Sequence, residues 1–152
     1  MESESLGSAT AAAQGAVLRP RVEDLATEEA LELLGSVALG RIVFTQHALP
    51  AVRPVNHLLD GGDIIIRPHE ASALSAVLEA EEGTGVVVAY EADAIDPATH
   101  LGWSVVATGY ATAVTDPVQL ERYSHLLRPW ADGMFSGAIR IAPGLITGFR
   151  LR

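Results

Sequence analysis

The sequence predicts a mainly β fold with a few inserted helices, in which one long sheet closes into a barrel. Apolar stretches of strand length recur along the chain, at residues 39–46, 51–59, 63–68, 85–95, 104–115 and 138–152. Most of them follow one another through connections suited to hairpins, which implies antiparallel pairing. Six or more strands of this length in 152 residues bury their apolar faces best when the sheet closes on itself.

Length and composition restrict the possible functions. One compact domain over residues 21–152 is expected, preceded by a small, polar and disordered tail over residues 1–20. The net charge of −9 argues against binding to nucleic acid or to anionic membranes. The absence of cysteine excludes disulfides, zinc–thiolate sites, iron–sulfur clusters and a cysteine nucleophile. No export signal or membrane segment is visible, so a cytoplasmic protein is expected.

Helices are expected at three places between the strands. The first covers Val22–Leu34, with Thr27 as a plausible N-cap and Gly35 as the stop. A second, short helix is expected over residues 70–80. The third begins at Asp116-Pro117 and runs to about residue 127, because proline suits the first helical position.

Three features refine the strand predictions. Ile42 and Phe44 alternate within residues 39–46 and are expected on one face. Pro54 cannot donate to a sheet ladder, so it marks an edge or a bulge in its strand. Pro143-Gly144 predicts a bend or an interruption in the closing strand.

The segment 53–68, RPVNHLLDGGDIIIRP, predicts a β-hairpin closed by Gly61-Gly62. With a two-residue loop, Asp60 pairs with Asp63, and residue numbers across the hairpin sum to a constant. Asn56 then lies opposite Arg67, with Cβ atoms about 4.5–5.5 Å apart. The hairpin therefore sets a carboxamide and a guanidinium on one face of the sheet.

This face adjoins the start of the helix expected over residues 70–80, whose first turn holds Ser72. A guanidinium, a hydroxyl and the free N–H groups of a helix start can together bind a phosphate. The carboxamide of Asn56 could then bind the polar edge of a ring attached to that phosphate. A plainer interpretation stays open, because such hairpins are common and an arginine at a strand end usually points into solvent.

The order of several motifs resembles that of a known family. The chain carries GRIVFT, then PAVRPVNHLLDGGDIIIRP, then VVVAYEADAIDPATHLGWSVVATGYATAV, and finally ITGFRL. Over about residues 22–151 it resembles the pyridoxamine 5′-phosphate oxidase-like flavoproteins, in the branch of the nitroimidazole-resistance-type proteins. The resemblance implies a split β-barrel that forms a homodimer, with FMN bound in two clefts at the dimer interface.

The resemblance also implies which residues contact the cofactor. Four residues would lie along the flavin ring and ribityl chain: Arg53, Val55, Asn56 and His57. Two would contact the phosphate: Arg67 and Ser72. Two more would approach the cofactor or the partner subunit: Trp103 and Ser104.

This chain departs from the family pattern near the phosphate. Pro68 stands where relatives carry a threonine, Ala73 replaces a lysine, and Glu70 adds a negative charge. Loss of one charge-assisted bond costs about 1.5–3 kcal/mol, or one to two decades of affinity. Phe149 also replaces an arginine in the terminal motif. We therefore expect FMN to bind more weakly here, or the cleft to have another use.

Two functions of different class remain. The first is an FMN-dependent oxidoreductase acting on a small planar or heterocyclic substrate, with no catalytic residue identified. Oxidation of pyridoxamine phosphate itself is disfavoured. The phosphate of that substrate needs a cluster of basic residues, and this acidic chain has few arginines or lysines to form one. The second is a cofactor-free binding protein or enzyme that uses the vacated cleft. Deazaflavin and haem are less favoured cofactors, and the five histidines show no metal-site spacing.

Overall fold

A computed structural model describes residues 19–68, 85–128 and 137–152 of the chain. These ranges contain seven strands and two helices. The strands are β1 (Val22–Asp24), β2 (Leu39–Gln46), β3 (Leu49–Asp60), β4 (Asp63–Ile66), β5 (Val86–Ile95), β6 (Gly102–Ala113) and β7 (Ile139–Leu151). The helices are α2 (Thr27–Gly35) and α4 (Pro117–Leu126).

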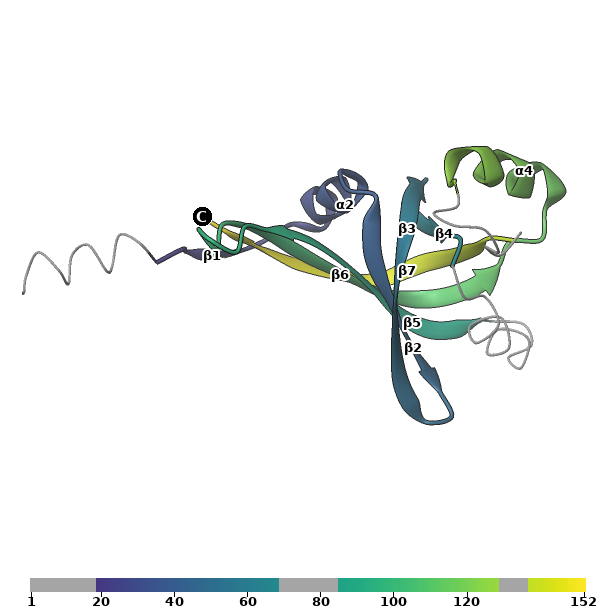
Figure 1. Ribbon diagram of the computed structural model, residues 1–152, viewed down its shortest axis with the longest axis horizontal. Helices are drawn as coiled ribbons and strands as arrows, with labels where there is room; N and C mark the ends of the chain where they lie inside the picture. Colours follow the sequence, from purple (N-terminus) through teal and green to yellow (C-terminus); the bar gives the residue numbers. More distant parts are fainter. Residues whose placement is uncertain (1–18, 69–84, 129–136) are drawn as a thin grey trace, which may run out of the picture.

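The strands form one antiparallel sheet that closes into a barrel. Their order is β1-β7-β4-β3-β2-β5-β6, and β6 also pairs with β7, so six strands complete a ring. Strand β1 adds to the C-terminal part of β7, beside the long ribbon of β5 and β6 (Figure 1). The predicted barrel is therefore confirmed.

The interior of the barrel holds the larger apolar core. Its members are buried side chains that alternate along the strands, including Ile42, Phe44, Ile64, Ile66, Tyr90, Val105 and Ile141. Helix α2 contributes Ala30 and Leu34 to the same core. A smaller cluster, with Ile65, Tyr123 and Leu127, lies between the outside of the barrel and α4. The two helices lie on the same side of the molecule, and the β2–β3 hairpin projects away from them (Figure 1).

The first predicted helix is wrong at its N-terminal end. Val22–Asp24 is strand β1, because it pairs with the last residues of β7. Helix α2 begins at Thr27, so the N-cap is Ala26 and not Thr27. Ala26 has an extended backbone, and no side chain caps the helix there. Tertiary pairing with the end of the chain thus overrides the local helical pattern.

The other predicted elements fit the described residues closely. Strand β2 has the predicted bounds, and Ile42 and Phe44 are buried on one face. Pro54 lies in the part of β3 that pairs with β2 but not with β4, which is the predicted edge. The pairing of β7 with β6 shifts by one residue at Gly144, so the predicted bend is a β-bulge. Most of the expected tail over residues 1–20 and the whole helix expected over residues 70–80 lie outside the described residues.

Candidate functional site

The β3–β4 hairpin has the register that the sequence predicts. Gly61 and Gly62 have φ angles of 60° and 88°, and a type I′ turn needs positive φ at both positions. Asp60 pairs with Asp63, and the ladder continues for three more pairs with the same sum of residue numbers. The last pair of the ladder is His57 with Ile66. If the same register continues by one position, Asn56 lies opposite Arg67.

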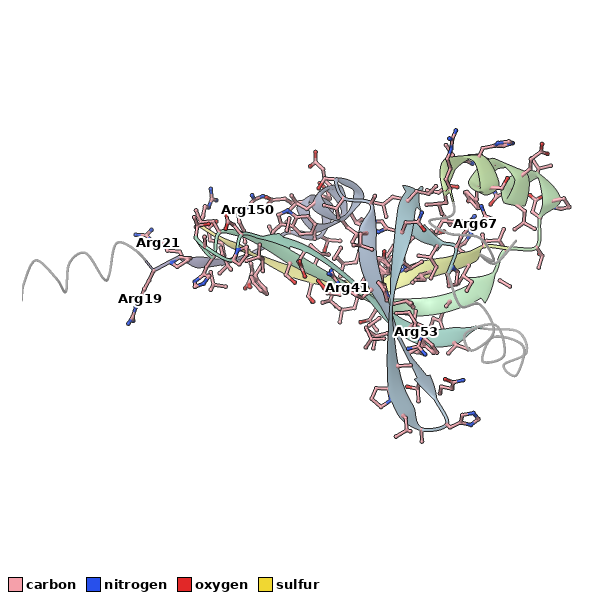
Figure 2. All side chains as sticks on the ribbon, in the orientation of Figure 1. Arg19, Arg21, Arg41, Arg53, Arg67 and Arg150 are labelled. Atoms are coloured by element: carbon pink, nitrogen blue, oxygen red, sulfur yellow. The ribbon has the colours of Figure 1, made fainter. Side chains whose placement is uncertain are left out.

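Asn56 and Arg67 meet at the C-terminal end of α4. The Nδ2 atom of Asn56 donates to the carbonyl of Arg128 at 3.1 Å. The Nη1 atom of Arg67 donates to the preceding carbonyl, that of Leu127, at 2.9 Å, and Nε donates to the carbonyl of Gly137 at 3.2 Å. Figure 2 shows Arg67 between the end of β4 and α4. The carbonyls at a helix C-terminus carry partial negative charge, so they stabilise this guanidinium.

Both side chains are largely buried. Asn56 is 9% exposed and Arg67 is 8% exposed. Buried polar groups of this kind must be hydrogen-bonded, and buried charges must be offset. The fold therefore holds a cation and a carboxamide in fixed positions at the root of the hairpin, where an anionic heterocycle could use both.

Arg53 and Val55 belong to the other face of β3. Val55 is buried in the barrel core, and its carbonyl accepts a hydrogen bond from Tyr90 at 3.3 Å. Arg53 pairs with Ile42 on β2 and is half-buried; its Nη1 atom donates to the carbonyl of Val52 at 2.9 Å. The backbone of this strand thus separates Arg53 and Val55 from Asn56, although the residues alternate along one segment.

His57 forms a buried network with Tyr90. The ring nitrogens are 2.7 Å from the carbonyl of Leu34 and 2.5 Å from the Tyr90 hydroxyl. The carbonyl can only accept, so Nε2 carries the proton and Nδ1 accepts from Tyr90. Burial lowers the pKa of His57 and raises the pKa of Tyr90, so both side chains stay neutral. This network joins α2 to the barrel, and both ring nitrogens of His57 are used within the chain.

Trp103 and Ser104 are neighbours on β6 but face opposite sides of the sheet. Trp103 is buried in the barrel core. Ser104 is half-buried on the outward face, where it pairs with Asp93 of β5 and Phe149 of β7. Two strands, β2 and β5, lie between β6 and β3. The described chain therefore brings Asn56 and Arg67 together and does not bring Trp103 or Ser104 to them.

The remaining predicted phosphate ligand cannot be placed. Ser72 lies outside the described residues, as do Glu70 and Ala73, which mark the departure from the family pattern. Pro68 is described, and its side chain is fully buried directly after Arg67.

The outward face of β2, β5 and β6 contains charged residues that the sequence reasoning missed. Paired residues define rows across the sheet from β3 to β7. One row consists of Pro54, Arg41, Glu91, Val106 and Thr147. The next consists of Val52, Val43, Ala89, Thr108 and Leu145. The spacing of Glu91 and Asp93 in a predicted strand could have shown that two carboxylates share this face.

Glu91, Asp93 and Arg41 form a cluster on this face. The Nη1 atom of Arg41 lies 3.8 Å from Glu91 and 3.7 Å from Asp93. Burial, followed by a hydrogen bond to Asp93 and its negative charge, raises the pKa of Glu91 to about 7. The Oε1 atom of Glu91 is buried and makes no hydrogen bond within the described residues.

A second polar cluster lines an open hollow of about 530 Å³ between the hairpin turn and the start of α4. Arg140 donates to Asp63 at 3.0 Å and to the Tyr123 hydroxyl at 2.7 Å. Tyr123 donates in turn to Asp60, which lies 3.2 Å from Arg122. These charges are paired with one another, so the cluster fastens α4 to the hairpin.

Comparison with known proteins identifies the family. The sequence model described as pyridoxamine 5′-phosphate oxidase matches residues 26–150. The chain belongs to this family. The expected family membership and split-barrel fold are therefore confirmed.

Relatives and solved structures agree with this assignment. An uncharacterized protein of Mycobacterium tuberculosis is 48% identical over 130 residues, which cover 86% of each chain. A Corynebacterium glutamicum structure, provisionally named a pyridoxamine 5′-phosphate oxidase, is 32% identical with a TM-score of 0.68 and covers 85% of this chain and 97% of its own. The FAD binding protein of Mycobacterium smegmatis is 30% identical with a TM-score of 0.63 and covers 87% and 100%.

A more distant structure has the same fold. A Bacteroides thetaiotaomicron protein named for resistance to 5-nitroimidazole antibiotics is 10% identical, with a TM-score of 0.64 over 86% of this chain and 90% of its own. At this identity, the similarity shows the fold alone.

Two further observations concern the described residues. Neither helix is long and apolar enough to cross a membrane. No group of three histidine, aspartate or glutamate side chains in these ranges has the geometry of a metal site.

Proposed function

We propose that this chain binds a flavin nucleotide, FMN in the first place, and acts as a flavin-dependent oxidoreductase on a small planar or heterocyclic substrate. The observation that carries the proposal is the buried pair of Asn56 and Arg67 on the hairpin. Support comes from the 30% identical relative that is named an FAD binding protein and is covered over its full length.

The residues present suit such a ligand in part. Arg67 supplies a buried positive charge for a phosphate, and Asn56 supplies an amide for a ring edge. Arg53, half-buried on the same strand, and Ser72, just beyond Pro68, are the further contacts that we propose from the family pattern. A bound flavin would supply hydride or electron transfer, whereas this chain's residues would position it and exclude water.

We further propose that the chain acts as a homodimer with two clefts at the interface. Support comes from the outward face, where Val52, Val87, Tyr110 and Leu145 are each more than half exposed. An extended apolar face of this kind marks an interaction surface. Ser104, on this outward face, would then contribute from the neighbouring subunit, whereas Trp103 would act only through its place in the barrel core.

A cofactor-free function is the second candidate. The observation that favours it is that Arg67 already donates Nε and Nη1 to backbone carbonyls of the chain. The exchange of a family lysine for Ala73 points in the same direction. In this case the cleft would bind a ligand without a phosphate.

Titration of the purified protein with FMN, FAD, riboflavin and a deazaflavin distinguishes the two candidates. We expect FMN to bind more tightly than riboflavin, because riboflavin lacks the phosphate. Asn56→Ala should weaken the binding of FMN by about 1 kcal/mol, which is the contribution of one hydrogen bond. Gln46→Ala, on the β2–β3 hairpin, is the control and should leave the affinity unchanged. Failure of every flavin to bind would favour the cofactor-free function.

Restoring the family lysine gives a second, independent test. Ala73→Lys should raise the affinity for FMN about tenfold at low salt, and this gain should shrink as salt screens the new charge. The affinity for riboflavin should not change. Equal tightening of both ligands would show that the phosphate is not bound beside residue 73.

A further inference from the structure

The guanidinium of Arg67 holds the end of α4 on the β3–β4 hairpin. Its Nη1 atom donates to the carbonyl of Leu127 at 2.9 Å, and its Nε atom donates to the carbonyl of Gly137 at 3.2 Å. The side chain of Asn56 adds a bond to the carbonyl of Arg128 at 3.1 Å. The two hairpin residues of the proposed flavin site are therefore also the residues that fasten the end of this helix.

The donors of Arg67 cannot serve a phosphate and all of these carbonyls at once. A guanidinium has five N–H groups, one on Nε and two on each Nη atom. Nε donates to Gly137, and Nη1 donates to Leu127 and, at 3.4 Å, to Ser124. A bidentate bond to phosphate uses two of the three nitrogens, so it must include Nε or Nη1. A phosphate bound in this way therefore displaces at least one carbonyl of the chain.

A second anchor holds α4 one turn earlier and does not involve Arg67. The hydroxyl of Tyr123 donates to Asp60 of the hairpin and accepts from Arg140 of β7 at 2.7 Å. The backbone N–H of Leu127 donates to the carbonyl of Tyr123 at 2.8 Å. Both anchors thus act on the same turn of the helix, so loosening one of them weakens the other.

We propose that the last turn of α4 and an anionic ligand compete for Arg67, so that binding of the anion releases this turn from the hairpin. The inference rests on the proposed function, in which Arg67 contacts the phosphate of a flavin nucleotide, and adds the regulation of that site. Arg67 is 8% exposed, and a buried charge must be offset in either state. The partial negative charge of the helix end offsets it without the ligand, and the larger charge of the phosphate offsets it with the ligand.

Hydrogen exchange of the full-length protein, followed over residues 117–128, tests the release directly. Saturating FMN should speed exchange of the Leu127 amide about fivefold, which corresponds to the loss of roughly one hydrogen bond. Riboflavin has the same ring without the phosphate and should leave the exchange unchanged. Arg67→Met has no donor, so this amide should exchange at the faster rate without any ligand.

Tyr123→Phe gives a second test, in which a weaker anchor improves binding. The change removes only the hydroxyl that bonds to Asp60 and Arg140, and it leaves Arg67 intact. Because coupling between two sites is reciprocal, FMN should bind about fivefold more tightly, and the affinity for riboflavin should not change. Val118→Ala, at a position of α4 that is 75% exposed, is the control and should leave both affinities unchanged.

The outcomes separate this inference from the flavin site itself. Exchange that FMN leaves unchanged or slows would overturn the inference while the flavin site stands. Weaker FMN binding in Tyr123→Phe would show that α4 orients Arg67 for the phosphate, and unchanged binding would show that the two are not linked; either result would overturn the inference alone. If neither FMN nor riboflavin binds to the parent protein, the proposed function fails and the inference fails with it.

Discussion

Tyr90 and Glu91 are consecutive residues of β5, yet they belong to opposite kinds of polar network. Tyr90 points into the barrel, where its hydroxyl bonds to His57. Glu91 points outward, where Arg41 and Asp93 surround it. Inside, both ring nitrogens of His57 have partners from the same chain. Outside, one buried oxygen of Glu91 has none among the described residues.

The difference shows what one chain can complete by itself. The inner network is made of neutral groups that close around one another, so it stabilises the fold. The outer cluster combines three ionisable groups with an apolar surface that the described chain leaves uncovered. We infer that the inside of β5 serves the barrel and the outside serves association, and the following predictions test this division.

The largest effect is expected from His57→Ala. The change leaves the carbonyl of Leu34 without its partner and opens a cavity between α2 and the barrel. The free energy of unfolding should fall by about 3 kcal/mol. Urea denaturation measures it, with His125→Ala on the exposed end of α4 as the control, which should change stability by no more than about 0.5 kcal/mol. Equal losses in both variants would contradict a structural role for the inner network.

Tyr90→Phe should cost less, about 1–2 kcal/mol. The ring still fills the core, but Nδ1 of His57 loses its donor and the carbonyl of Val55 loses a weaker contact. Combined with His57→Ala, the two losses should be clearly less than additive, because both remove the same hydrogen bond. Additive losses would show that the two side chains act independently.

Acid should weaken the inner network. The pKa of His57 is lowered from 6.5 by burial, so the unfolded chain binds a proton more readily than the folded chain. Its contribution to stability is complete above about pH 6.5 and is lost as the pH falls, by at most about 1.4 kcal/mol per pH unit. Urea midpoints of the parent should therefore fall faster below pH 6.5 than those of His57→Ala. Parallel curves would contradict this.

The smallest effect is expected from Glu91→Gln, and it has the opposite pH dependence. The pKa of Glu91 is raised to about 7, so its contribution is complete below about pH 4.5 and is lost as the pH rises through 7. The variant should gain stability relative to the parent between pH 5 and pH 8, by no more than about 1 kcal/mol because the side chain is partly solvated. A relative loss on the alkaline side would show that ionised Glu91 is stabilised.

Much of the fold could be predicted from local patterns. Strand β2 and the hairpin register follow from alternation and from Gly61-Gly62, which act over a few residues. Strand β1 could not be predicted, because it exists through pairing with the far end of the chain.

The site was predictable only in part, for a similar reason. The register placed Asn56 against Arg67, but their acceptors at the end of α4 lie about 60–70 residues further along. His57 was expected along the flavin, and its network with Leu34 and Tyr90 depends on contacts that no local pattern reveals. The cluster around Glu91 was missed, although the alternation of acidic residues in β5 carried the signal.

Sedimentation velocity of the FMN-loaded protein, followed in the flavin absorption band, tests the central claim most directly. We predict that the flavin sediments with a dimer of two 16.0 kDa chains, at one flavin per chain. This result would show that flavin binding and dimer formation occur in the same assembly. Flavin that stays behind the protein boundary, or protein that sediments as a monomer with or without flavin, would contradict the account.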